Sequence, residues 1–171
     1  NGPKGIGFLY IRSGVELIPY ADGGAQENAH RAGTENVASI VGMAAALKRN
    51  CDLLQQHQLH ILNLEQQLLS HLDTAGVPYK RNGGASSLPG LLSLSFPGQD
   101  GEAILHRMDL MGISISTGSA CDSVNTEISH VLKAIGLDED HAKGTVRISL
   151  GRYNSETDVE AIAAALTKIV G

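Results

Sequence analysis

The chain has 171 residues, of which 42% are hydrophobic, and 13 Lys and Arg against 18 Asp and Glu give it a formal net charge of −5. This length allows one domain, or one and a fraction, with a proper core, and the composition excludes a disordered or fibrous protein. The negative charge, the 4% share of aromatic residues and the absence of tryptophan argue against binding to nucleic acid. No apolar run approaches the roughly 18 residues of a membrane span. The two cysteines form no regularly spaced disulfide framework, and we see no secretory signal. We therefore expect reduced thiols in a cytoplasmic protein.

The first part of the chain predicts two short strands and a loop. Residues 6–11 form an apolar run bounded by glycines, which is typical of a buried strand. Residues 15–17 alternate as in a second strand, which Pro19 ends. A loop with several glycines then covers residues 20–34.

A long helical pattern follows this loop. From Asn36 to Leu72 apolar residues recur at steps of three and four, which predicts one amphipathic helix, with a break near Asn50 as the alternative. A continuous helix over these residues would be about 55 Å long, enough to join two domains. Cys51 lies on the apolar stripe, so we expect it to pack in the core.

The second half of the chain mixes strands with helices. Leu92, Leu94 and Phe96 alternate with serines, as in a strand with one buried face. Asp100 is placed to cap one helix, and residues 155–158 resemble the capping box of another. The irregular order of elements predicts an α+β domain whose sheet is covered on one face by helices. The expected strands are residues 91–96, 113–116 and 145–150, and the expected helices are residues 101–111, 130–135 and 156–170.

Arg31 and Thr34 stand at the end of the glycine-bearing loop, where the long helix begins. Thr34 is placed as an N-cap, and its hydroxyl and the N–H groups of a helix N-terminus can bind a phosphate. Arg31 would add positive charge to such a site. The alternative is a threonine that only caps the helix, beside a solvated arginine.

Cys121 stands in a run of small polar residues, whereas a free cysteine is normally a buried apolar side chain. A thiol on such a loop can react as a thiolate and carry a group away. The alternative is a loop cysteine without a role.

Arg147 is expected on the face of its strand opposite the core, because Val146, Ile148 and Leu150 share the other face. There its planar fork can bind a carboxylate, although an ordinary exposed arginine is the alternative. His57 and His60 have no acidic or cysteine partner nearby in the sequence, so we expect no metal site.

Several motifs occur in a fixed order along the chain. Gly-Pro-Lys-Gly-Ile-Gly occupies residues 2–7, Gly-Gly-Ala-Gln-Glu residues 23–27 and Arg-Ala-Gly-Thr-Glu-Asn residues 31–36. Gly-Ser-Ala-Cys at residues 118–121 and Val-Arg-Ile-Ser-Leu-Gly at residues 146–151 follow. In this order and spacing the motifs resemble the NifS/IscS-like cysteine desulfurases, a branch of the class-V aminotransferase group of pyridoxal-phosphate enzymes, across essentially the whole chain.

The resemblance implies a role for each candidate residue. Cys121 matches the nucleophile that takes sulfur from L-cysteine as a persulfide and leaves alanine. Thr34 matches a residue that reaches the phosphate of pyridoxal 5'-phosphate across a homodimer interface. Arg147 matches the arginine that holds the substrate carboxylate.

The resemblance also implies that the chain is the C-terminal part of a fold type I transferase. Residues 1–35 would end the large cofactor-binding domain, residues 36–75 would form a long connecting helix, and residues 76–171 would form the small α+β domain, with a mixed or antiparallel sheet.

The family's Schiff-base lysine, in a Ser-x-His-Lys run, would fall upstream of Asn1, and Lys4 is not that lysine. The chain alone is therefore expected to be inactive. The whole protein is expected to supply iron–sulfur cluster or thio-cofactor assembly through a sulfur-accepting scaffold protein. The alternatives are a selenocysteine lyase, a class-V aminotransferase, or a non-catalytic module that docks the scaffold.

Overall fold

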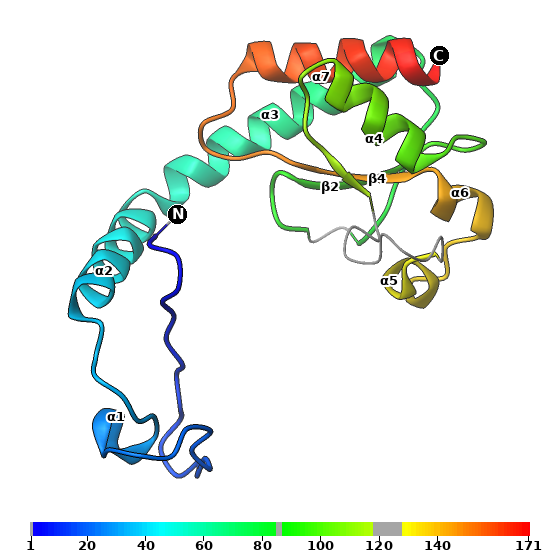
Figure 1. Cartoon of the computed structure of the whole chain (residues 1–171). Coiled ribbons are helices and arrows are strands. Elements are labelled where there is room, and N and C mark those ends of the chain that lie inside the picture. Colours follow the sequence, from blue (N-terminus) through cyan, green and yellow to red (C-terminus); the bar gives the residue numbers. More distant parts are fainter. Residues whose placement is uncertain (1, 85–86, 118–127) are drawn as a thin grey trace. The chain divides into compact units, whose positions relative to one another are not determined.

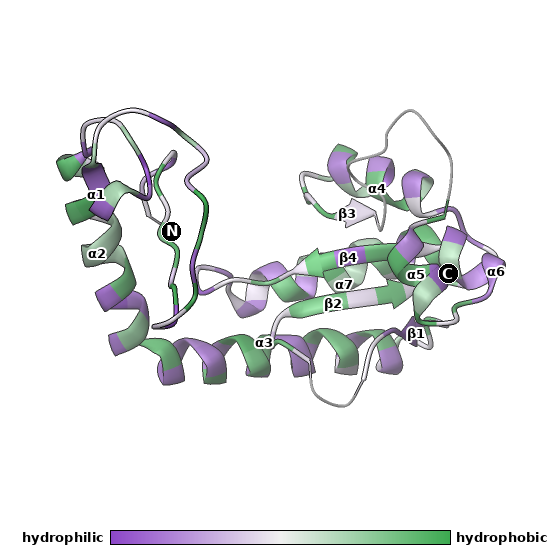
Figure 2. Ribbon diagram, turned by 90° about the horizontal axis from the view of Figure 1, so that it is seen from below, coloured by the Kyte–Doolittle hydropathy of each residue, from purple (hydrophilic) through white to green (hydrophobic). Residues whose placement is uncertain are grey.

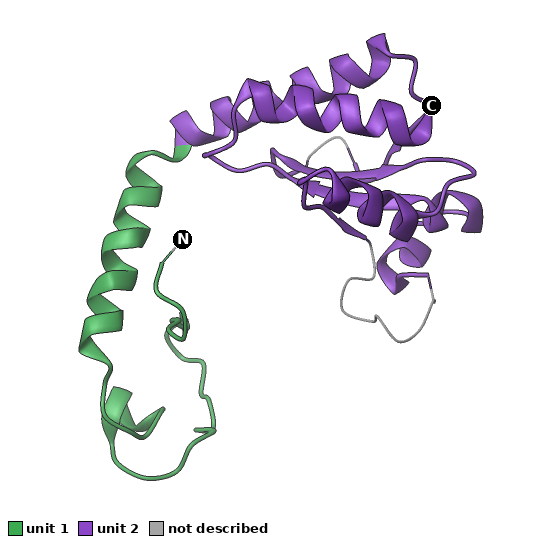
Figure 3. Ribbon diagram, turned by 45° about the horizontal axis from the view of Figure 1, so that its top comes forward, with its two compact units in different colours: residues 1–54 green, residues 55–171 purple. Residues whose placement is uncertain are grey.

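The computed structural model describes residues 2–84, 87–117 and 128–171 (Figure 1). The chain divides into two compact units, unit 1 at Asn1–Leu54 and unit 2 at Gln55–Gly171 (Figure 3). The three-part division expected for the chain, at residues 1–35, 36–75 and 76–171, stays a prediction. Among the described residues, no helix is long and apolar enough to cross a membrane.

Unit 1 contains the short helix α1 (Gln26–Ala29) and the helix α2 (Val37–Asp52). The predicted strands at residues 6–11 and 15–17 are wrong for this structure, since residues 2–54 contain no strand. None of these residues is buried, and Phe8, Leu9 and Tyr10 are 69%, 75% and 80% exposed. An extended segment becomes a strand only where a neighbouring strand supplies hydrogen bonds, and no described segment does so here.

The long helical pattern folds as two helices, α2 and α3 (Leu54–Thr74), in agreement with the predicted alternative of a break. The break falls at Leu53, directly after Asn50, Cys51 and Asp52, whose helix propensities are low. The expected core position of Cys51 is wrong, because this cysteine is exposed near the end of α2.

The N-cap of α2 is Asn36, whose side-chain oxygen accepts a hydrogen bond from the Ser39 N–H at 3.2 Å. The prediction that Thr34 caps the helix is therefore wrong. Asparagine is a strong capping residue, and its position two residues further along sets where the helix begins.

Unit 2 is built on a four-stranded antiparallel sheet. In spatial order its strands are β1 (Lys80–Arg81), β2 (Leu91–Ser95), β4 (Thr145–Ser149) and β3 (Ser116–Thr117). β2 and β4 lie at the predicted places, whereas β3 covers only the end of the segment expected at residues 113–116. The predicted α+β architecture, with an antiparallel sheet, is confirmed.

Three helices cover one face of this sheet: α3, α4 (Gly101–Leu110) and α7 (Glu156–Val170) (Figures 1 and 2). The predicted caps of α4 and α7 are confirmed. Asp100 accepts from the N–H groups of Glu102 and Ala103, and Ser155 forms a complete capping box with Asp158.

Two short helices complete unit 2: α5 (His130–Ala134), which was predicted, and α6 (Glu139–Lys143), which was not. Asp138 caps α6. The backbone N–H and the ring of His141 both bond to this carboxylate and lower its pKa to about 2.

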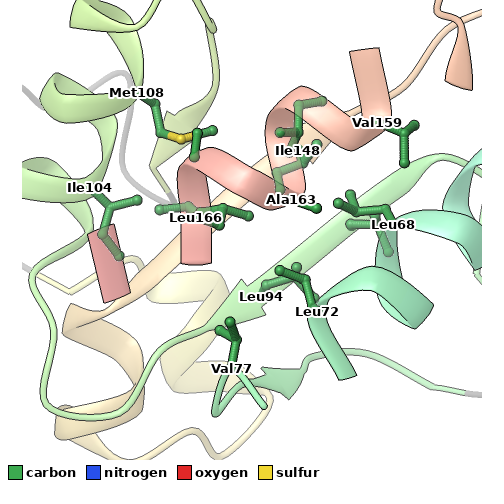
Figure 4. Close-up of a cluster of buried hydrophobic side chains, with 14 of the residues drawn as sticks. Leu68, Leu72, Val77, Leu94, Ile104, Met108, Ile148, Val159, Ala163 and Leu166 are labelled. Carbon is green, nitrogen blue, oxygen red and sulfur yellow. The ribbon is translucent and has the colours of Figure 1, made fainter. Parts of the chain in front are cut away.

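The core lies between the sheet and these helices. Register places Leu92 opposite Ile148 and Leu94 opposite Val146, so β2 and β4 present one continuous apolar surface. Side chains of the three helices pack on it (Figure 4). They include Leu64, Leu68 and Leu72 of α3, Ile104 and Met108 of α4, and Val159, Ile162 and Leu166 of α7.

A buried carboxylate ties α3 to the sheet. Glu65 is only 3% exposed, and its Oε1 accepts from Arg81 Nη2 at 2.6 Å while its Oε2 accepts from the Gly90 N–H at 2.7 Å. The Gly90 carbonyl oxygen in turn accepts from the Leu150 N–H at 2.8 Å. Gly90 has a φ of +80°, and a Cβ there would clash with Ile61. Glu65 therefore fixes the start of β2 beside the end of β4.

Helix α3 offers a matched test of the core. Leu68→Ala should destabilise the chain by about 2–5 kcal/mol, because the residue is fully buried and the change leaves a cavity. Leu59→Ala, on the same helix at a position that is 64% exposed, should cost less than about 0.5 kcal/mol. Urea unfolding followed by circular dichroism measures both. Equal losses would contradict the packing of α3 described above.

Candidate functional site

Arg147 lies on the face of the sheet that the three helices leave uncovered. Its neighbours in sequence, Val146 and Ile148, are 0% and 2% exposed in the core, and Arg147 points the other way and is exposed. The sequence prediction for its face is confirmed. Among the residues that the structure describes, none forms an ion pair or hydrogen bond with Arg147. The guanidinium fork is thus available to a carboxylate ligand.

A row of polar residues crosses this open face at the level of Arg147. Register places Ser93 of β2 and Ser116 of β3 directly opposite Arg147, one on each side. Asn82 extends the row beyond Ser93, because its N–H donates to the Ser93 carbonyl oxygen at 2.9 Å. Both serines are half-buried. The row therefore places small groups that can form hydrogen bonds on both sides of the Arg147 guanidinium.

Strand β3 is held at the edge of the sheet by its last residue. Thr117 is buried, and its hydroxyl donates to Glu102 of α4 at 2.9 Å. This bond fixes the point from which the chain enters residues 118–127, which include Cys121. Cys121 itself lies outside the described residues.

Thr34 belongs to a loop of unit 1 whose backbone is bound by its own side chains. Gln26 Oε1 accepts from the Gly33 N–H at 3.1 Å, and Arg31 Nη1 donates to the Gly33 carbonyl oxygen at 2.6 Å. Arg31 also lies 3.7 Å from the Glu27 carboxylate, so this loop already engages its guanidinium. Thr34 is exposed. The structure thus leaves the Thr34 hydroxyl accessible but does not place Arg31 free beside it.

The structure does not define the three candidate residues relative to one another. Thr34 lies in unit 1 and Arg147 in unit 2, and each unit is defined by itself. Among the described residues, no group of three His, Cys, Asp or Glu side chains could hold a metal ion. His60, from the rejected histidine pair, bonds instead through Nε2 to the Asn154 carbonyl oxygen at 3.0 Å.

Comparison with known families assigns the fold. The family model described as "Aminotransferase class-V" matches residues 1–162. The chain belongs to the class-V aminotransferase family.

The similar proteins reported below are named as cysteine desulfurases or as NifS-like proteins. The chain is 42% identical to a cysteine desulfurase of Klebsiella pneumoniae and 36% identical to the cysteine desulfurase NifS of Azotobacter vinelandii, with 99% of the chain covered in both. A solved structure titled as a NifS-like protein superimposes with a TM-score of 0.85 at 37% identity over 98% of the chain. The predicted resemblance to NifS/IscS-like cysteine desulfurases is therefore confirmed. The chain spans only 42–43% of the length of these relatives.

One residue of this chain, Thr34, suits a contact to pyridoxal phosphate, whereas the lysine that would bind the cofactor covalently is not found in this chain. The accessible Thr34 hydroxyl precedes α2, whose first turn carries no acidic residue, and this suits one contact to a phosphate. None of the six lysines follows a histidine, so the chain contains no Ser-x-His-Lys run. Among the described residues, Thr34 can thus offer one hydrogen bond to the phosphate of such a cofactor.

Sequence reasoning identified Arg147 but missed Ser93, Ser116 and Asn82. The alternation of serines with Leu92 and Leu94 placed Ser93 on the polar face. Only the pairing register shows that Ser93 and Ser116 lie opposite Arg147, because these strands are separated in the sequence by long connections.

Proposed function

We propose that the protein to which this chain belongs is a pyridoxal-phosphate-dependent cysteine desulfurase. It would convert L-cysteine to L-alanine and place the sulfur on Cys121 as a persulfide. The proposal is carried by Arg147, an exposed guanidinium that no described residue pairs, in a chain that is 42% identical to a cysteine desulfurase.

The proposed reaction balances without an external oxidant. The Cys121 thiolate attacks the sulfur of L-cysteine, so an S–S bond forms and the substrate C–S bond breaks. The electron pair of that bond stays with the substrate carbon, which takes up a proton to give alanine. Bound pyridoxal phosphate supplies the electron sink that makes the substrate reactive.

Each residue of this chain has a separate part in that reaction. Arg147 would bind the substrate carboxylate with two parallel hydrogen bonds and so orient the amino acid. Thr34 would bond to the cofactor phosphate across a homodimer interface, as the resemblance implies. Cys121 would carry the sulfur to a scaffold protein for iron–sulfur cluster or thio-cofactor assembly, in the cytoplasm.

The role of Cys121 can be tested against the chain's other cysteine. In the full-length protein supplied with L-cysteine and pyridoxal phosphate, Cys121→Ala should abolish alanine and sulfide formation, because the variant lacks the thiolate that accepts the sulfur. Cys51→Ala, at an exposed position of α2, should retain wild-type rates. Alanine and sulfide are quantified for all three proteins. Alanine formation that survives in Cys121→Ala would mean that Cys121 is incidental and would favour a sister activity on the same scaffold, such as a selenocysteine lyase.

The role of Arg147 predicts a defect in substrate binding. Arg147→Lys keeps the charge but loses the bidentate fork, so KM for L-cysteine should rise about 10-fold or more. Arg107→Lys, an exposed position of α4, is the matched control and should leave KM unchanged. Steady-state kinetics on the full-length protein measure both. An unchanged KM in Arg147→Lys would remove the carboxylate role.

The chain by itself should not attach pyridoxal phosphate to a lysine, because none of its lysines stands in the family's Ser-x-His-Lys run. Equimolar cofactor added to the 171-residue chain should therefore give no visible absorption band that survives dialysis. The full-length protein, treated in the same way, is the positive control. A persistent band in the chain alone would contradict the assignment.

A further inference from the structure

The polar row on the open face of the sheet contains a hydroxyl that the proposed reaction does not use. Ser93 lies directly opposite Arg147 in the β2–β4 pair. Both side chains rise from the face opposite Leu92 and Ile148, which are buried in the core. Side chains directly opposite each other in an antiparallel pair have Cβ atoms about 4.5–5.5 Å apart. Ser93 and Arg147 can therefore meet one small ligand.

The hydrogen-bond pattern leaves the Ser93 hydroxyl free to donate. Its oxygen accepts from Asn82 Nδ2 at 3.2 Å, and the same nitrogen donates to Ser95 Oγ at 2.7 Å. Both hydrogens of the amide are thus used on the two serines. No described residue accepts the hydrogen of Ser93, which is only half-buried.

Ser95, two residues along β2, differs from Ser93 in its hydrogen bonds. Ser95 is fully buried and bonds to Thr145 Oγ1 at 2.7 Å. The Thr145 hydroxyl donates to the His141 carbonyl oxygen at 2.7 Å, so Ser95 must be the donor to Thr145. The Ser95 hydroxyl therefore donates its hydrogen to Thr145, whereas no described residue accepts the hydrogen of the Ser93 hydroxyl.

The side chain of Asn82 bonds to both serines through its nitrogen but leaves its own oxygen unsatisfied among the described residues. Its Oδ1 atom is buried, and no described residue bonds to it, although an unpaired buried acceptor destabilises a protein by roughly 1–3 kcal/mol. The amide keeps its nitrogen toward the two serines despite this. The orientation of the Ser93 oxygen is thus fixed from the side away from Arg147.

We propose that Ser93 is a second substrate-binding residue, whose hydroxyl donates a hydrogen bond to the carboxylate that Arg147 binds. Arg147 supplies the charge, and Ser93 fixes the orientation of the carboxylate relative to the sheet. This inference rests on the proposed function, since the carboxylate is that of L-cysteine.

Kinetics of serine variants in the full-length protein test the proposal. Ser93→Ala should raise KM for L-cysteine about 10-fold and change kcat less than about 2-fold, as expected for the loss of a hydrogen bond to a charged group that forms on binding. Ser149→Ala is the matched control: this exposed serine lies on β4, on the same face as Arg147, and pairs with Leu91. It should keep the wild-type KM.

A second pair of variants separates the hydroxyl from the size of the side chain. Thr and Val have nearly the same shape and both favour strands, and they differ in the hydroxyl. Ser93→Thr should retain a KM close to that of the wild type, and Ser93→Val should show the increase seen for Ser93→Ala. This pair decides the proposal if Ser93→Ala does not fold.

Three results would overturn the proposal: a KM in Ser93→Ala within 2-fold of the wild type, an equal rise in Ser149→Ala, or equal values for Ser93→Thr and Ser93→Val. The wild-type rate in the same assay tests the proposed function. If the wild type forms no alanine from L-cysteine, both proposals fall; if it does and the Ser93 variants match it, only the role of Ser93 falls.

Discussion

The pairing of β2 with β4 is the constraint on which the described site depends. Five residue pairs fix its register, and alternate pairs point to opposite faces. Leu92 with Ile148 and Leu94 with Val146 therefore face the helices, while Ser93 with Arg147 faces away from them. A slip of one residue would turn Arg147 into the apolar core, where an unpaired guanidinium is very unfavourable. The apolar core thus holds the candidate binding residue on the accessible face.

In unit 2 a buried charge is fully hydrogen-bonded, whereas an exposed charge has no partner among the described residues. The Glu65 carboxylate is 3% exposed and both of its oxygens accept hydrogen bonds, one from Arg81 and one from Gly90. Such complete pairing is what a buried charge requires. Arg147 is exposed, and no described residue pairs with it. An arginine in water needs no partner for stability, so its fork remains available to a ligand. The difference supports a structural role for Glu65 and a binding role for Arg147.

Unit 1 differs from unit 2 in having no core of its own. None of its described residues is buried, and its apolar side chains at residues 8–10 are exposed. This agrees with a chain that covers 43% of its relative from Klebsiella pneumoniae, because in a longer protein such side chains can pack on other segments. The Thr34 loop is nevertheless bound by its own side chains, through Gln26 and Arg31. These hydrogen bonds within the loop contribute to its local conformation.

The sequence alone determined the elements whose signals are local. The leucine pattern of α3, the Asp100 and Ser155 caps and the alternation in β2 and β4 were all readable, and so were the face of Arg147 and the resemblance to cysteine desulfurases. Tertiary structure decided the rest. Residues 6–11 have the composition of a strand but no partner strand among the described residues, and Cys51 lies on an apolar stripe but is exposed. The positions of Ser93 and Ser116 beside Arg147 depend on pairing between strands far apart in the sequence. Local patterns set the face on which a side chain lies, but only long-range register sets its neighbours.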